Sequence, residues 1–260
     1  MFKILKYSFF DLMRSSWSYV YFVFYLLLGF TLLFLNNDLS KAIITLMNVI
    51  IVLVPLIGTI FGVMYYYNSK EFTELLLAQP LKRSSIFLGQ YFGVALSLSM
   101  SLILGLGLPF ITYGLFRSNA IWDFSLLLVI GVFLTLIFSA LAFNIALSNE
   151  NKIKGFGYAI LVWLFLSIIY DGLFLISLIV FEDYPLDTLS LIGTTLNPID
   201  LSRTLIILKL DISALLGYTG AVFKKFFGTN FGLIISFITL LIWTIIPILR
   251  IVFKSKRKDF

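Results

Sequence analysis

The sequence predicts an all-α integral membrane protein with six membrane-spanning helices, and three observations lead to this prediction. Hydrophobic residues make up 60% of the 260-residue chain and charged residues only 12%, whereas soluble domains are about 25% charged. The mean hydropathy is +1.05. Six stretches reach the length of about 20 apolar residues that a helix needs to cross a bilayer. These stretches do not alternate between apolar and polar residues, as the strands of a membrane barrel do.

The chain contains no cysteine and no histidine, which excludes several kinds of chemistry. Disulfide frameworks, thiolate metal sites, cysteine nucleophiles and histidine-based triads all need one of these residues. No Gly-x-x-x-x-Gly-Lys-[Ser/Thr] motif is present, so the chain has no P-loop for ATP. We therefore expect the chain to have no metal site and none of these catalytic sites.

The six predicted spans follow one another from the N-terminal region to the C-terminal region of a single transmembrane domain, residues 1–260. Residues 1–16 precede the first span and are expected to form an interfacial helix, because apolar side chains alternate there with Lys3, Lys6 and Arg14. In the third span, Gly105 and Pro109 predict a kink or a break near the outer end. The predicted spans are residues 17–35, 43–66, 86–116, 121–147, 156–181 and 231–253.

The distribution of lysine and arginine predicts the orientation. If the N-terminus is cytoplasmic, the two short outer loops hold only Lys41 and Arg117, and most other basic residues lie in cytoplasmic segments. Such a bias sets the orientation of membrane proteins. Both termini are therefore predicted to be cytoplasmic, and the net charge of +6 is explained by the membrane, with no need for a nucleic-acid partner.

Residues 182–230, between the fifth and sixth spans, are expected to form a large extracytoplasmic helical segment. A seventh span at residues 201–223 is rejected, because Arg203, Lys209 and Asp211 would each cost about 2.5–3.5 kcal/mol near the bilayer centre. The helix expected there is apolar on more than one face, so it must bury itself against lipid, a second copy of the chain or a partner protein. Interfacial packing and a docking platform remain open.

Two features within the spans stand out. Asp171 lies in the fifth span, where a carboxylate is costly and normally faces the bundle interior or an aqueous cavity. A role in transport or gating and a role in helix contacts both remain open. The pairs Gly58/Gly62 and Gly89/Gly93 are expected to allow close helix packing.

The loop between the second and third spans, residues 68–84, has the order of a short helix. Acidic residues open it, apolar residues follow, and Pro80 precedes a basic pair, which suits the helix dipole and a proline stop. Its apolar face could enter a groove on a soluble partner or lie on the membrane. The candidate residues are Glu71, Phe72, Thr73, Glu74, Leu75, Leu76, Gln79, Pro80, Lys82 and Arg83.

This loop resembles the coupling helix of ABC transporter permeases of the type-two exporter class. The shared features are the acidic start, the run Glu74-Leu75-Leu76-Leu77, and Gln79-Pro80 followed by a basic residue. A second segment, which begins Asn197-Pro198-Ile199-Asp200-Leu201-Ser202-Arg203, resembles the outer segment of the NosY family of permeases, which is associated with nitrous-oxide reductase maturation. Tyr170-Asp171 is similar to that family too.

The resemblance implies a non-catalytic subunit that binds no cofactor itself and forms a homodimer in the bacterial inner (plasma) membrane. Two ABC ATPase subunits would carry ATP and Mg and would act on the coupling helix, and a periplasmic repeat protein would bind the outer segment. The complex would support assembly of the copper centres of nitrous-oxide reductase. The extracytoplasmic partner-binding residues would be Asn197, Pro198, Asp200, Arg203, Asp211 and Tyr218, and Asp171 would be an intramembrane polar residue.

Two other functions remain open. The chain could be an ABC exporter permease that moves a small molecule, a lipid or a peptide. Alternatively, it could be a stand-alone channel or membrane scaffold that needs no ATPase subunit.

Overall fold

The computed structural model describes residues 1–36, 38–181, 186–210 and 230–257, and every regular element among them is helical. The described residues contain six helices that are long and apolar enough to cross a membrane, which confirms the predicted fold class. These are α2 (Ser16–Leu35), α3 (Leu39–Asn68), α5 (Arg83–Thr112), α6 (Ile121–Ser148), the composite helix Lys152–Val180 and α12 (Asn230–Arg257).

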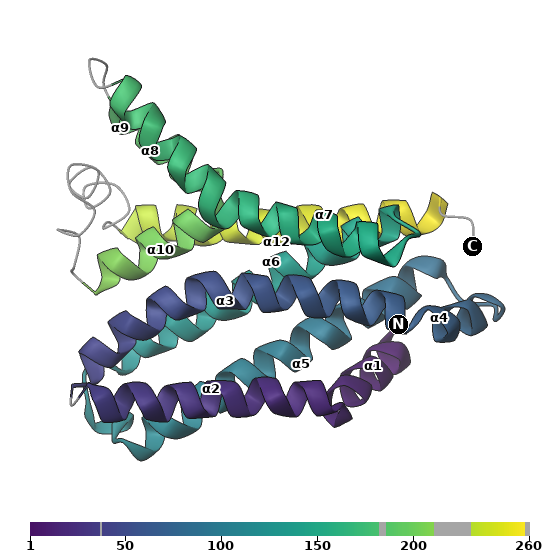
Figure 1. Ribbon diagram of the computed structural model, residues 1–260, viewed down its shortest axis with the longest axis horizontal. Helices are drawn as coiled ribbons and strands as arrows, with labels where there is room; N and C mark the ends of the chain where they lie inside the picture. The colour runs from purple at the N-terminus through teal and green to yellow at the C-terminus, as the bar shows by residue number, and fades with distance from the viewer. Residues whose placement is uncertain (37, 182–185, 211–229, 258–260) are drawn as a thin grey trace.

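The helices form a bundle whose core lies around α5 and α6. Helix α3 packs against α6, α2 packs against α5, and α12 contacts both α5 and α6. The first helix, α1 (Phe2–Arg14), also packs against α5. Figure 1 shows that α1, the short helix α4 (Lys70–Leu77) and the last turns of α12 lie at one end of the bundle, called the α4 end below.

Both predicted glycine pairs lie where helices approach closely. A Cβ atom on Gly62 would lie 2.7 Å from Cβ of Ala142 on α6, and one on Gly93 would lie 2.5 Å from Cβ of Ser8 on α1. These distances are shorter than van der Waals contact, so only glycine allows this spacing. The expected role of the two pairs in close helix packing is confirmed.

The third span differs from its predicted form at its outer end. The helix is continuous through Gly105 and Pro109 and ends at Thr112, so of the predicted kink or break, the break does not occur. The chain then turns at Gly114, whose φ is 92°, and enters a 3-10 turn, η1 (Leu115–Arg117). Gly105 serves packing, because a Cβ there would lie 2.8 Å from Cβ of Tyr25 on α2.

The fifth span is a composite of three parts. Helix α7 (Lys152–Leu164) packs against α3 and α6, η2 (Phe165–Ile169) is a π-helical turn, and α8 (Tyr170–Val180) continues beyond it. Helices α8 and α9 (Leu186–Thr195) project away from the rest of the bundle, whereas α10 (Pro198–Lys209) lies back along it (Figure 1).

Candidate functional site

The loop predicted to contain a short helix does contain one, α4, at the α4 end. Helix α4 covers Lys70–Leu77 and ends three residues before Pro80. Glu71 lies in its first turn, where a carboxylate interacts favourably with the helix dipole. Glu74 lies 3.8 Å from Lys70 Nζ, as an exposed i,i+4 pair.

One face of α4 is fixed to two neighbouring helices. The ring of Phe72 stacks on Tyr7 of α1, with 4.6 Å between the ring centroids. On the adjacent side, Gln90 of α5 donates a hydrogen bond of 2.7 Å to the hydroxyl of Thr73, and that hydroxyl donates to the carbonyl of Ser69 at 2.8 Å. Because Thr73 and Gln90 are both buried, a displacement of α4 must strain its contacts with α1 and α5.

The opposite face of α4 and the turn after it are open. Leu75 is 68% exposed although it is apolar, and the exposed carboxylates of Glu71 and Glu74 flank it. The exposed residues of this face and turn are Glu71, Glu74, Leu75, Gln79, Pro80, Lys82 and Arg83, while Leu76 is half-buried.

A second site forms where α9 turns into α10. Asn197 donates a hydrogen bond of 2.7 Å to the carbonyl of Leu166, and the carbonyl of Thr195 accepts one of 3.2 Å from Trp243 Nε1. Leu166 and Trp243 lie halfway along the fifth and sixth spans, Lys152–Val180 and Phe231–Lys256. The turn between α9 and α10 therefore lies at the mid-depth of the bundle, and the two helices form a re-entrant pair.

A charged group surrounds this turn. Arg203 Nη1 lies 2.8 Å from Asp171 Oδ2 and 3.2 Å from Asp200 Oδ1. Asn197 donates to Asp200 Oδ2 at 2.8 Å, and its side-chain oxygen accepts from the backbone of Ile199. We call Asp171, Asn197, Asp200 and Arg203 the Asp171 cluster. Two carboxylates facing one guanidinium give this cluster a formal charge of −1 when both carboxylates are ionised.

The π-helical turn explains why the carbonyl of Leu166 is free to accept a hydrogen bond from Asn197. In a regular α-helix the N–H of Tyr170 would bond to the carbonyl of Leu166, four residues earlier. Here that N–H bonds to the carbonyl of Phe165 instead. The Leu166 carbonyl accepts the Asn197 side chain, so the turn gives α10 a hydrogen-bonding group on the fifth span.

The structure brings together residues that the sequence placed in separate groups. Asp171, predicted as an isolated intramembrane residue, pairs with Arg203, predicted to bind a partner. Asn197, Pro198 and Asp200 are buried within this chain, so partner binding by their side chains would require them to leave these contacts. Direct partner binding stays a prediction. Asp211 and Tyr218 lie outside the described residues.

Several residues of the two sites were not predicted as site residues. Gln90 is a lone amide in an apolar run, and the cost of burying it without a partner was the signal that it needs one. Tyr170 donates a hydrogen bond of 2.6 Å to the carbonyl of Gly193, which fixes α9 to α8. Nothing in the sequence marked Leu166, since its contribution is a backbone carbonyl.

The class of protein that these features define is a multi-pass, all-α membrane protein with a short anchored helix at one end of its bundle and a re-entrant pair beside the fifth span. No family model matches the chain. A probable ABC transporter permease protein NosY from Stutzerimonas stutzeri is 26% identical to it over 183 residues, which are 68% of this chain. The match spans 64% of the relative's own length. This similarity confirms the resemblance that the motifs indicated.

Proposed function

We propose that this chain is the membrane-spanning permease subunit of an ABC transporter, and that α4 receives the motion of a cytoplasmic ATPase subunit. The observation that carries the proposal is the two-faced environment of α4. One face is held by Tyr7 and Gln90, and the other exposes Glu71, Glu74 and Leu75. A helix held in this way transmits a push to α1 and α5 instead of absorbing it.

We propose that the Asp171 cluster, at the mid-depth of the bundle, receives the movement of the spans. It joins α8 to α10 through Arg203, and α10 contacts α3, α6 and α12. Rigid-body movement of the spans would therefore reach α8, α9 and α10 together. In this proposal the cluster transmits motion, while hydrolysis of ATP with its Mg takes place on the partner subunits.

The finer assignment follows the resemblance to NosY. We propose a homodimer with two ATPase subunits in a bacterial inner membrane, with both termini cytoplasmic. A periplasmic repeat protein would bind the outer part, and the complex would support copper-site assembly of nitrous-oxide reductase. The chain has no cysteine or histidine, which are common copper ligands, so it would supply motion while its partners handle the metal.

The test compares charge reversals at the α4 end. The complex is purified through a tag on this chain, its subunits are identified by mass spectrometry, and ATP hydrolysis is measured. Replacing Glu71 and Glu74 by lysine is expected to lower hydrolysis by about tenfold, the equivalent of losing ~1.4 kcal/mol of binding. Glu150→Lys is the matched control, because Glu150 is an exposed acidic residue in the loop between α6 and α7.

We expect the Glu150→Lys complex to keep its subunits and its activity. Unchanged hydrolysis and unchanged assembly in the Glu71/Glu74 variant would remove α4 from the mechanism. Failure of any nucleotide-binding subunit to co-purify with the unmodified chain would favour a stand-alone channel or scaffold.

A further inference from the structure

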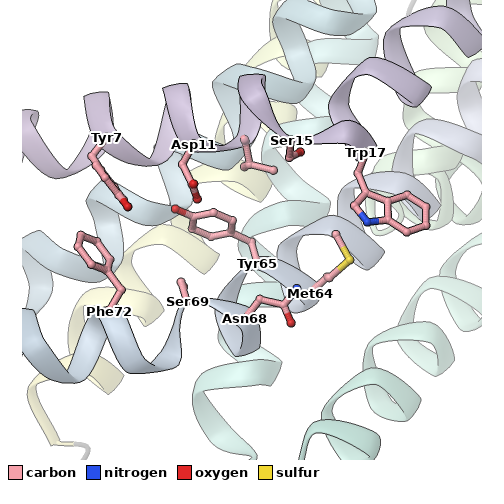
Figure 2. Close-up of a pocket in the computed structure, with 10 residues that line it drawn as sticks. Tyr7, Asp11, Ser15, Trp17, Met64, Tyr65, Asn68, Ser69 and Phe72 are labelled. Carbon is pink, nitrogen blue, oxygen red and sulfur yellow. The ribbon is translucent and has the colours of Figure 1, made fainter.

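A pocket of about 330 Å³ lies between α1, the end of α3 and the start of α4. Figure 2 shows the rings of Tyr7, Tyr65 and Phe72 gathered beside the carboxylate of Asp11, with Trp17 farther along the same side. Asp11 is the one charged residue among those that line the pocket. The pocket is therefore acidic and aromatic, a combination that suits a cation.

Two cations that lie close to lining residues have partners other than Asp11. Lys152 Nζ donates to the side-chain oxygen of Asn68 at 3.1 Å, and Lys70 pairs with Glu74. No ion pair to Asp11 occurs within the described residues. The carboxylate of Asp11 is exposed, so it can receive a positive group from outside the chain.

The hydroxyl of Tyr65 provides a second, independent indication of a ligand. Tyr65 is only 6% exposed and lines the pocket. Its hydroxyl is buried with the side chains of Ser8 and Asp11 close to it, and neither makes a hydrogen bond of good geometry to it within the described residues. An unsatisfied buried polar group is costly, and a ligand with N–H groups would satisfy this one.

The position of the pocket indicates a lipid as the source of the cation. It lies where the amphipathic helix α1 joins the first span, and Trp17 and Tyr7 at this junction are 60% and 52% exposed. Exposed tryptophan and tyrosine side chains at the end of a span are typical of the headgroup region. Arg14 lies three residues after Asp11 on the exposed side of α1, within reach of a phosphate next to a bound ammonium.

We propose that this pocket binds the ammonium headgroup of phosphatidylethanolamine. The rings would hold the cation by cation–π attraction, Asp11 would pair with it, and the Tyr65 hydroxyl would accept one of its N–H groups. A choline headgroup keeps the charge but has no N–H group to donate. An anionic headgroup would be repelled by Asp11. Phe72 of α4 forms one wall of the pocket. A bound lipid would therefore stabilise the position of α4, the helix that we propose contacts the ATPase subunit.

The test uses the purified full chain in detergent without an ATPase subunit, so its outcome is independent of the proposed function. Native mass spectrometry measures the binding of phosphatidylethanolamine, phosphatidylcholine and phosphatidylglycerol. Phosphatidylethanolamine is expected to bind most tightly. Asp11→Asn is expected to weaken its binding by about threefold to tenfold, the effect of losing one exposed ion pair and its hydrogen bond.

Two further variants make the test specific. Tyr65→Phe removes only the hydroxyl, and we expect it to lower binding of phosphatidylethanolamine without changing that of phosphatidylcholine. Asp123→Asn is the matched control, because Asp123 follows Trp122 at the opposite end of the bundle, and it is expected to bind like the unmodified chain.

Equal binding of the three lipids, or an Asp11→Asn variant that matches Asp123→Asn, would overturn the proposal. A separate purification of the complex adds one outcome. If Asp11→Asn loses the ATPase subunit there while its lipid binding is unchanged, the pocket binds a basic side chain of that partner, and the lipid proposal is overturned.

Discussion

Arg203 is the residue on which the mid-depth site depends. It faces two carboxylates, Asp171 on α8 and Asp200 on its own helix. Without the guanidinium, the two carboxylates would remain close together with no opposite charge. Without Asp171, Arg203 would still have Asp200 as a partner. The removal of one member of a partly buried ion pair is costly because the other member keeps its charge.

This asymmetry gives a prediction for stability. Arg203→Gln is expected to lower the free energy of unfolding by about 1–3 kcal/mol, and Asp171→Asn by clearly less. Lys209→Gln is the control, because Lys209 is an exposed cation farther along α10. The measurement is thermal unfolding in detergent, followed by tryptophan fluorescence. Equal losses in all three variants would mean that the cluster contributes nothing specific.

The sequence predicted the members of this site better than their arrangement. Asp171 was recognised because a carboxylate is costly inside a membrane, and Arg203 was recognised through the resemblance to the NosY family. Their pairing depends on the re-entry of α9 and α10, and no residue pattern indicated that path. Asn197-Pro198 was a usable signal, since Asn is a common N-cap and Pro a common first helical residue. That signal marks where α10 starts in the sequence but not how deep in the bundle it lies.

At the scale of elements, α1 is attached to the bundle by close contact with α5. Gly89 and Gly93 face Ile4 and Ser8 of α1 at distances that leave no room for a side chain. Since α1 also stacks on α4 through Tyr7, its position fixes one wall of the lipid pocket. The packing of two helices therefore controls both proposed sites at the α4 end.

A pair of substitutions within α5 tests this attachment. Gly93→Ala is expected to lower the free energy of unfolding by about 1–3 kcal/mol, because its Cβ would overlap Ser8. Gly107→Ala is the matched control, since a Cβ there meets nothing within 4 Å, and alanine favours a helix by about 0.5–1 kcal/mol. Thermal unfolding of the two variants should shift in opposite directions. A stabilising Gly93→Ala would contradict the close contact of α1 and α5.

The elements themselves were largely predictable. Span positions follow from runs of apolar residues, and the predicted ends fall within four residues of the observed ones, as for residues 86–116 against Arg83–Thr112. The helix in residues 68–84 was predicted from charge order and Pro80, and α4 is that helix. Its anchor was not predicted, because the hydrogen bond between Gln90 and Thr73 depends on how α5 packs.

At the scale of the whole molecule, the arrangement of the α4 end agrees with an even number of spans. The start of α1 and the last turns of α12 lie at the same end as α4 (Figure 1). The basic residues of the tail and of the α4 loop therefore gather on one side. The lysine and arginine bias predicts that this side is cytoplasmic.

The absence of cysteine from the chain makes this orientation directly testable. Lys41→Cys and Gln79→Cys place single thiols at exposed positions at opposite ends of the bundle. A membrane-impermeant maleimide added to spheroplasts is expected to label the first variant, and to label the second only after permeabilisation. The unmodified chain should not be labelled. The reverse pattern would invert the predicted topology.

The sequence predicted the outline of the molecule but not the depth of the turn between α9 and α10. Residues 182–230 were predicted to be extracytoplasmic because a span there would bury Arg203, Lys209 and Asp211 and would place the basic tail outside. A helix of 12 residues such as α10 is too short to cross a bilayer, and irregular backbone at mid-depth is tolerated only when the protein surrounds it. Whether a segment has such surroundings depends on the packing of other helices, which hydropathy does not report.

The π-helical turn also acts as a phase shift along the fifth span. Each residue of an α-helix turns the chain by about 100°, so a wider turn changes the direction of every side chain after it. Helix α7 buries Gly155 and Ala159 against the bundle, whereas α8 buries none of its residues. The side chains of α7 and α8 therefore follow different helical registers on either side of the turn. Deleting one residue of the turn would restore a regular α-helix, whose own N–H groups would compete with Asn197 for the carbonyls of the turn.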